Sequence, residues 1–213
     1  KLGLNNDIAC FDISLGCSGY IYGLSILQSF LRNNELNNGL LFTADPYSKI
    51  IDDNDKNTKI IFSDAATLSF FSNNSNNSYY LKYSAYETYG EYFDKLIVRN
   101  RKLHMNGTSI LNFTIKTLPK FINSFFLKNK INKKDIDGFI FHQASKYILD
   151  FLQKKCDIPN EKMFNNIDKV GNTVSSSIPL ILSEHLKSKK KLILVGFGVG
   201  LSASIGYIIP SSE

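Results

Sequence analysis

The chain has 213 residues, 43% of them hydrophobic and 13% aromatic, so it can bury one sizeable core and is not a disordered tail. Its formal net charge of +6 at pH 7 favours an acidic partner. Lysines gather in residues 127–134 and 187–191, but neither cluster has the interleaved aromatic side chains of a nucleic-acid platform. We interpret both clusters as solvated helix ends and keep a docking surface as the alternative.

Cysteine usage and one long apolar run bear on the compartment. Cys10, Cys17 and Cys156 show no C-x-x-C spacing and are too few for a disulfide framework, which fits a reducing compartment. No signal-like segment follows Lys1, so we expect a cytoplasmic protein. Residues 192–209 carry no charge, but four glycines dilute the run. Two buried strands explain it better than a membrane span.

Hydrophobic periodicity predicts strands that alternate with helices. In the first part it indicates a strand at 7–13, a helix at 18–33, a strand at 39–45, strands within 60–71 and 79–87 separated by a low-complexity loop at 72–78, and a helix at 109–128. In the second part it indicates strands at 138–143 and 163–167, helices at 144–156 and 173–187, and strands at 191–197 and 202–210. Such alternation is typical of an α/β fold with mainly parallel, buried strands. Each part reads as a β-α-β-α-β-β unit, but the first lacks its opening strand and helix.

One cysteine stands where the first predicted strand runs into the first predicted helix, in FDISLGCSGYIYGL at 11–24. The helix dipole and the unpaired N–H groups at such a position lower the pKa of a thiol. The small residues Ser18 and Gly19 leave the sulfur of Cys17 uncrowded. We therefore interpret Cys17 as a nucleophile, with a small buried residue as the alternative; the latter is our interpretation of Cys10 and Cys156.

Two further segments place polar side chains where strands end and helices begin. FIFHQAS puts His142 at the carboxyl end of a predicted buried strand, and VGNTVSSSIP puts Asn172 in a glycine-led loop before a helix. Because active-site groups of α/β folds collect at such ends, Cys17, His142 and Asn172 could converge on one crevice. Taken singly, the histidine fits a structural hydrogen-bonding role and the asparagine fits a helix N-cap.

Four segments stand in the order found in one enzyme family: DISLGCSGYIYGL, FHQASKYI, GNTVSSSIP and GFGVGLSASI. Over almost its whole length the chain resembles β-ketoacyl-acyl carrier protein synthase III, of the thiolase superfamily. The resemblance implies a thiolase-like layered α/β fold of two related β-α-β-α-β-β halves, the first of them truncated. It divides the chain into the remainder of the N-terminal half (1–98), a connecting loop and helix (99–134) and the C-terminal half (135–213). It also implies a homodimer.

The same resemblance implies a reaction and the residues that perform it. An acyl group would move from acyl-CoA to Cys17, and malonyl-acyl carrier protein would then lose carbon dioxide at His142 and Asn172 and condense with the acyl group. This would initiate fatty-acid or related chains without a metal or redox cofactor. The oxyanion loop falls on Gly198, Val199 and Gly200, and substrate-binding positions fall on Lys56, Phe62, Asn106, Gly107, Ser145 and Phe197.

Several positions depart from the family's usual motifs. Ser145 and Tyr147 replace the asparagine and arginine of H-Q-A-N-x-R, which touch the pantetheine arm or help dock the acidic carrier protein. GFGVG stands where three consecutive glycines are usual, and FSDAA replaces F-G-D-G-A. We expect the core chemistry to be retained and carrier docking to be altered, with the remaining attraction supplied by lysines and sensitive to salt.

Other functions use similar residues. A variant acyltransferase would pass the acyl group from Cys17 to an amine or hydroxyl, and a cysteine hydrolase would pass it to water. A catalytically silent scaffold is a further alternative. GVGLSA at 198–203 satisfies the dinucleotide-binding pattern G-x-G-x-x-A, but only ten residues follow it, which leaves no room for the helix and strand that the motif requires.

Overall fold

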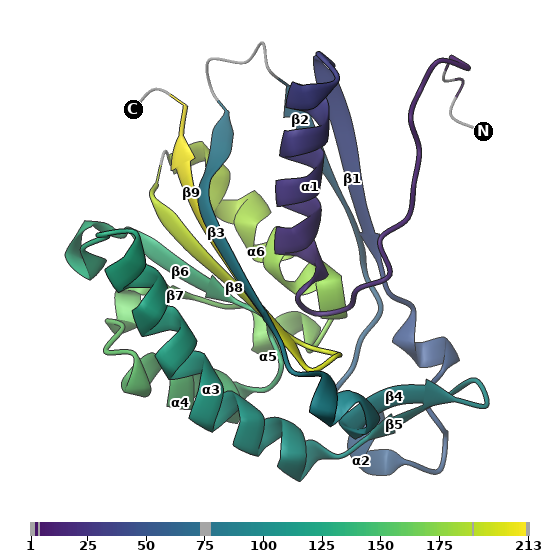
Figure 1. The fold of residues 1–213 in the computed structure, drawn as a ribbon. Coiled ribbons are helices and arrows are strands. Elements are labelled where there is room, and N and C mark those ends of the chain that lie inside the picture. The colour runs from purple at the N-terminus through teal and green to yellow at the C-terminus, as the bar shows by residue number, and fades with distance from the viewer. Residues whose placement is uncertain (1–2, 4, 73–77, 189, 212–213) are drawn as a thin grey trace.

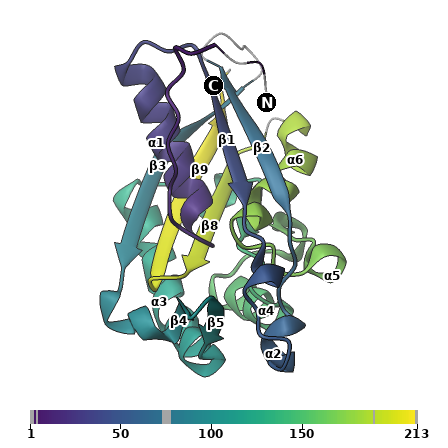
Figure 2. The same ribbon diagram turned by 90° about the vertical axis from the view of Figure 1, so that its right-hand side faces the viewer.

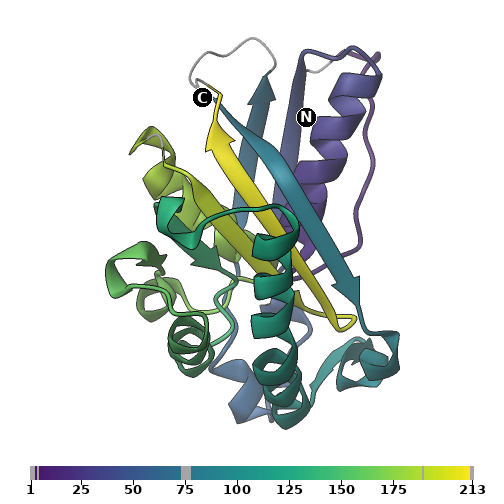
Figure 3. The ribbon, with the colours of Figure 1, turned by 60° about the vertical axis from the view of Figure 1, so that its left-hand side comes forward.

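The computed structural model describes residues 3, 5–72, 78–188 and 190–211, and their elements stack in four layers (Figure 1). A five-stranded mixed sheet has the strand order β3-β9-β8-β6-β7. Helices α3 (Gly107–Lys128) and α4 (Lys146–Lys155) cover one face of this sheet, as Figure 3 shows from the side of α3. Helices α1 (Gly19–Asn33) and α6 (Ser177–His185) cover the other face, and the β1–β2 pair lies beyond them (Figure 2).

The second half forms a complete β-α-β-α-β-β unit. It contains β6 (Gly138–Phe141), α4, β7 (Met163–Phe164), the short helix α5 (Ile167–Val170), α6, β8 (Leu192–Gly198) and β9 (Ser202–Pro210). β6 pairs in parallel with β7 and β8, whereas β8 and β9 pair antiparallel. The described first half supplies α1, β1 (Asn38–Ala44) and β2 (Ala66–Ser72), which match the last three elements of the same unit. The expected layered α/β fold is therefore confirmed.

Two elements connect the halves. β3 (Tyr79–Thr88) pairs antiparallel with β9 and so extends the sheet of the second half. A hairpin of β4 (Leu96–Arg99) and β5 (Lys102–Met105) then leads into α3. The short helix α2 (Lys56–Lys59) lies between β1 and β2 in sequence. The domain boundaries at 98 and 134 remain predictions.

The core lies on both faces of the five-stranded sheet. Along β8, Ile193, Val195 and Phe197 point toward the α3–α4 side, while Leu192 and Leu194 point toward the α1–α6 side. This alternation follows from the two-residue period of a strand. All seven residues of β8 and all nine of β9 are buried, so the uncharged run 192–209 forms the interior of the sheet. Within the described residues, no helix is long and apolar enough to cross a membrane.

Two sequence-based expectations about the strands are wrong, and one strand pair was missed. Residues 7–13 form no strand, because their backbone pairs with no described strand, and six of the seven residues are exposed. The strands are not mainly parallel, because four of the described strand pairs (β1–β2, β3–β9, β4–β5 and β8–β9) are antiparallel, whereas β6 alone pairs in parallel, with β7 and β8. The β4–β5 hairpin was not predicted at all. The loop expected at 72–78 lies mostly outside the described residues.

Candidate active site

Cys17 lies just before α1, pressed against the backbone of β8. A Cβ atom built at Gly196 would lie 2.8 Å from the Cys17 carbonyl oxygen, and one built at Gly198 would lie 2.7 Å from the Cys17 Cβ and 2.8 Å from its Sγ. These contacts involve backbone or the nucleophile itself and leave a side chain no room, so both positions require glycine. The sulfur therefore packs against the end of β8 and the loop that follows.

Burial gives the Cys17 thiol the opposite pKa shift from the one expected at a helix start. Cys17 is only 4% exposed, and desolvation, followed by the negative charge of Asp45, raises its pKa to about 12. Hydrogen bonds from the backbone N–H groups of Cys17 and Val199 to the sulfur act in the other direction but are outweighed. The expectation of a lowered pKa is thus wrong, because burial keeps Cys17 a thiol at neutral pH. The same two N–H groups are suited to hold an oxyanion.

His142 follows directly after β6, and its position is fixed by the sheet. Its backbone N–H donates to the Val195 carbonyl of β8 at 2.8 Å, and its ring packs edge-on against Phe197 at 5.4 Å between centroids. Burial lowers the pKa of the imidazole to about 3, with the backbone of Val174 acting weakly in the opposite direction. Nδ1 is enclosed without a partner among the described residues, so Nε2 is the nitrogen available to a substrate. A neutral imidazole carries one N–H donor.

Asn172 is held by its backbone and by its side-chain oxygen. Its backbone N–H donates to the Ile61 carbonyl at 3.1 Å, and its carbonyl accepts from the Ser63 N–H at 2.8 Å, so the residue forms a bridge to the segment before β2. The side-chain Oδ1 accepts from the Val174 N–H at 2.9 Å. Because the oxygen is occupied in this way, the NH2 group of the buried side chain remains as a hydrogen-bond donor.

One cavity of about 200 Å³ brings these three side chains together. It is lined by Cys17, His142 and Asn172, as expected from the sequence, and by five other predicted residues: Phe62, Gly107, Ser145, Phe197 and Gly198. Most of the remaining wall is apolar and comes from Ile61, Leu96, Met105, Ile110, Leu111 and Ile148. The cavity therefore offers a thiol and two neutral donor groups in an otherwise apolar setting.

Four predicted site residues do not line this cavity. Lys56 is exposed on α2, and the Asn106 side chain accepts from the Ser109 N–H at 2.9 Å as the N-cap of α3. Val199 and Gly200 belong to the turn between β8 and β9, where the Val199 N–H reaches the sulfur of Cys17. No helix follows this turn, because β9 begins at Ser202, so the dinucleotide-binding alternative is wrong.

The two positions that depart from the family motif lie at the cavity. Ser145 caps α4 by accepting a hydrogen bond from the Ile148 N–H at 3.3 Å. Tyr147 also lines the cavity but is 63% exposed, so its side chain lies at the mouth. Their proposed effect on carrier docking remains a prediction.

Other parts of the wall were missed from the sequence. Leu96 and Met105 come from the β4–β5 hairpin, whose turn has Asn100 and Arg101 in the left-handed region at φ 50° and 62°. Asparagine between two short apolar-polar alternations is a signal for such a turn. Val174, which positions Asn172, carries no signal of its own in the sequence.

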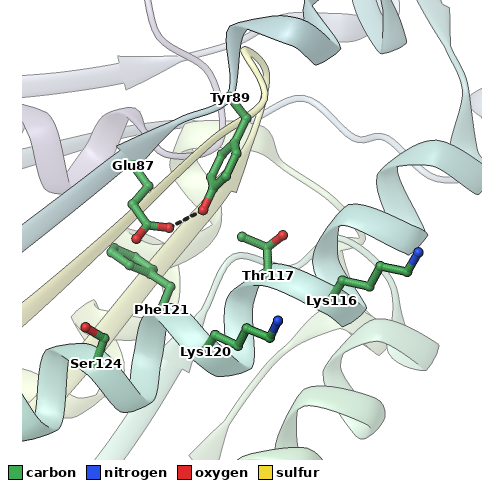
Figure 4. Close-up of a pocket in the computed structure, with 7 residues that line it drawn as sticks. All are labelled: Glu87, Tyr89, Lys116, Thr117, Lys120, Phe121 and Ser124. Carbon is green, nitrogen blue, oxygen red and sulfur yellow. Dashed lines mark hydrogen bonds between the residues drawn. The ribbon is translucent and has the colours of Figure 1, made fainter.

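A second cavity, of about 420 Å³, lies between the end of β3 and α3 and contains none of the three predicted catalytic residues (Figure 4). In it the Tyr89 hydroxyl donates to the Glu87 carboxylate, above Thr117 and Lys120 of α3. Across the described residues, no group of three or more His, Cys, Asp or Glu side chains is placed to hold a metal ion.

Known proteins resemble the chain in both sequence and fold. A family model of 3-oxoacyl-[acyl-carrier-protein] synthase III matches residues 11–90, and a model of its C-terminal part matches residues 126–208. The β-ketoacyl-[acyl-carrier-protein] synthase III of Clostridium botulinum strain Okra is 35% identical over 212 residues, which cover 91% of this chain and 65% of the relative. The chain thus spans slightly less than two thirds of that relative.

Solved structures agree with these matches. A 3-oxoacyl-(acyl-carrier-protein) synthase III structure superposes with a TM-score of 0.89 at 29% identity, covering 98% of this chain and 71% of the other. The Aquifex aeolicus enzyme of the same name gives 0.88 at 27% identity, covering 96% and 68%. OleA of Xanthomonas campestris gives 0.88 at only 16% identity, covering 98% and 68%, and shows the shared fold alone.

One relative settles the family. The synthase III of Clostridium botulinum strain Hall is 34% identical over 221 residues and is matched over 68% of its own length. Together with the two family models and the layered fold, this match shows that the chain belongs to the β-ketoacyl-[acyl-carrier-protein] synthase III family of the thiolase superfamily.

Proposed function

We propose that the protein transfers an acyl group to Cys17 and then condenses it with a malonyl thioester. The observation that carries the proposal is the shared cavity, in which a thiol meets the free NH2 group of Asn172 and the neutral imidazole of His142. A thiol accepts acyl groups, and a pair of neutral donors stabilises an enolate oxygen. Family membership supports the same reaction.

In the first half-reaction, the Cys17 sulfur attacks the carbonyl carbon of an acyl thioester. The carbonyl oxygen becomes an oxyanion, which the N–H groups of Cys17 and Val199 are suited to stabilise. The intermediate collapses by breaking the bond to the departing thiol, and the proton of Cys17 ends on that leaving group. Because burial keeps Cys17 protonated before substrate binds, this proton transfer is part of the step.

In the second half-reaction, a malonyl thioester loses carbon dioxide beside His142 and Asn172. The electron pair of the broken carbon–carbon bond forms an enolate, whose oxygen accepts hydrogen bonds from the imidazole Nε2–H and the Asn172 NH2 group. The enolate carbon attacks the acyl-Cys17 carbonyl, and collapse breaks the carbon–sulfur bond, which releases a β-ketoacyl thioester and the Cys17 thiolate. The thiolate then takes a proton from water and becomes a thiol again. Burial supports the donor role of His142, because it keeps the imidazole neutral.

The proposal extends to substrates and assembly. Acyl-CoA is the proposed primer and malonyl-acyl carrier protein the proposed extender, in the initiation of fatty-acid or related chains, and the reaction as proposed needs no cofactor. We further propose a homodimer in the cytoplasm. Light scattering on the complete protein at micromolar concentration tests the dimer, which a monomer would contradict.

Separating the half-reactions tests the proposed function. Intact mass after incubation with a panel of acyl-CoAs should show one adduct, which Cys17→Ala removes and Cys156→Ala, a buried cysteine outside the cavity, retains. His142→Ala and Asn172→Ala should still accept the acyl group but lose about a hundredfold or more of malonyl decarboxylation. His185→Ala, outside the cavity, serves as the matched histidine control.

Two outcomes would contradict the proposal. Condensation at normal rates in both donor variants would remove the role of His142 and Asn172. A wild-type protein that never consumes malonyl thioester, while it passes the acyl group to an amine or alcohol, would make it a variant acyltransferase; passage to water alone would make it a hydrolase.

A further inference from the structure

The turn that carries Asn172 contains a strained residue. Val174 has φ 54°, in the left-handed region that a β-branched side chain rarely adopts, and it is 1% exposed. Its N–H holds the Oδ1 of Asn172, and its backbone also acts on the imidazole of His142. Such a conformation persists only where the surrounding structure imposes it. The residues that impose it therefore also set the donor geometry.

A carboxylate from the first half holds this turn. Asp45 directly follows β1, and its Oδ2 accepts hydrogen bonds from both the N–H of Ser175, at 3.1 Å, and the Ser175 hydroxyl. Ser175 is the residue next to Val174. A carboxylate that accepts two hydrogen bonds from one residue fixes both its backbone and its side chain, and such charge-assisted bonds are stronger than neutral ones.

Neighbouring polar contacts fasten the same turn to β1 and to the start of β2. The Ser176 hydroxyl lies 2.8 Å from the Thr43 Oγ1, and 3.3 Å from the carbonyls of Thr43 and Ala65. These groups are neutral, whereas Asp45 brings a charge. The same charge also reaches Cys17 and Tyr47, since it disfavours ionisation of both. Asp45 thus acts on Cys17 and on the turn that carries Asn172 without lining the cavity.

We propose that Asp45 is a positioning residue, whose bonds to Ser175 hold the 172–176 turn so that Asn172 and His142 present their donors to the same substrate oxygen. Asp45 does not touch the substrate and acts through Ser175 and Val174. The effect on catalysis rests on the proposed function, because it assumes that these donors stabilise an enolate. The effect on the geometry of Asn172 does not depend on the proposed function.

Three variants test whether Asp45 holds the 172–176 turn. Asp45→Ala removes both bonds, whereas Asp45→Asn keeps an oxygen acceptor for the Ser175 N–H and removes the charge. Asp137→Ala is the matched control, because Asp137 also accepts a backbone N–H from another segment, that of Lys191 at 2.7 Å, but lies at the start of β6, at the opposite end from His142.

The expected result is a split between the two half-reactions. Asp45→Ala should lower malonyl decarboxylation about tenfold or more, because small displacements of catalytic groups are costly, while acylation of Cys17 stays within about threefold. The decarboxylation rate of Asp45→Asn should lie between those of Asp45→Ala and the wild type. Asp137→Ala should change neither the decarboxylation rate nor the acylation rate. Equal losses of both half-reactions in Asp45→Ala would reduce Asp45 to a general structural residue, and unchanged rates would exclude any role.

Two further readouts do not depend on malonyl chemistry. The side-chain amide signals of Asn172 in ¹H–¹⁵N spectra, assigned through Asn172→Asp, should shift in Asp45→Ala and stay in place in Asp137→Ala. The pH profile of iodoacetamide labelling at Cys17 should move to lower pH in Asp45→Asn, where Tyr47 and His142 remain as the other titratable neighbours. Unshifted Asn172 signals would contradict the positioning role of Asp45, whether or not the proposed synthase reaction occurs.

Discussion

The five-stranded sheet and the β1–β2 pair differ in how completely each is covered. Every residue of β8 and β9 is buried between two layers of helices. The β1–β2 pair packs one face on α1 and α6 and exposes the other, where Leu40 faces Phe70 and Phe42 faces Leu68 across the strands. These four side chains are 41–67% exposed. An apolar group of this kind on a strand pair is unusual for a free surface.

This difference separates two ways of building the site. The covered sheet supplies Gly198 and His142 at the ends of strands that cannot shift without disturbing the core. The β1–β2 pair supplies no group to the cavity from its strands, and contributes through the segments at their ends, which bond Asn172 and Ser175. Changes in the sheet should therefore act directly on chemistry or folding, whereas changes in β1–β2 should be better tolerated.

The largest contrast is expected between two glycines. Gly198→Ala should abolish acylation of Cys17, or lower it about a hundredfold or more, because the added Cβ would overlap the nucleophile. Gly39→Ala in β1 meets only the ends of the Leu27 and Leu31 side chains, which can move, so acylation should change little. Intact mass after timed incubation with acyl-CoA measures both. Normal acylation in Gly198→Ala would mean that the turn is free to move away from the sulfur.

A second contrast concerns stability. Leu194→Ala in β8 removes a fully buried side chain and should cost about 2–5 kcal/mol in the free energy of unfolding. Phe42→Ala in β1 removes a side chain that is 58% exposed and should cost less than about 1 kcal/mol. Urea denaturation compares the two. Equal costs would show that the outer face of β1–β2 is covered in solution.

Sequence patterns predicted the covered region better than the open one. Strands buried on both faces, such as β8, read as continuous apolar runs, and their bounds were close to those expected. Residues 7–13 also contain apolar side chains but find no pairing partner among the described residues, and periodicity does not reveal a missing partner. The antiparallel pairing of β8 and β9 was available from the sequence, because three residues between strands are too few for a parallel crossover.

The candidate site, too, could be predicted only where a local sequence pattern marks it. Cys17, His142 and Asn172 could be placed because each stands where a predicted element begins or ends, and the cavity confirms that they meet. The raised pKa of Cys17 could not be predicted, because a sequence shows the helix start but not the depth of burial or the distance to Asp45. Val174 and Asp45 act through long-range hydrogen bonds, which leave no periodic pattern.

The buried histidine predicts a pH dependence of stability. The folded-state pKa of His142 is lowered to about 3, whereas an unfolded histidine titrates near about 6.5. Between these values the unfolded chain binds a proton that the folded chain does not, so stability is lost as pH falls below about 6.5, by at most ~1.4 kcal/mol per pH unit. His142→Gln should flatten this loss between pH 7.5 and 5, measured by urea denaturation. An unchanged slope in that variant would assign the pH dependence to other groups, and His185→Gln controls for a histidine that is less buried.

The smallest effect, on carrier-protein binding, is expected from the lysine clusters, because they lie at the end of the sheet far from the cavity. Residues 127–134 precede β6, and residues 187, 188, 190 and 191 precede β8, so the described parts of both clusters lie at the end opposite His142 and Gly198. Lys146, by contrast, begins α4 beside the cavity mouth, with a side chain 60% exposed.

Charge reversal of lysines therefore compares the contributions of the cavity mouth and of the opposite end of the sheet to carrier binding. Lys146→Glu should weaken binding of an acidic carrier protein a few-fold at low salt, and the difference should fade as ionic strength rises. Reversal of Lys134 and Lys187, which are both exposed, should have less effect, since screening limits attraction over the length of the sheet. Titration of the carrier protein at two salt concentrations measures all three variants. If Lys134 and Lys187 matter more than Lys146, the clusters are the docking surface after all, and the carrier approaches from the far end of the sheet.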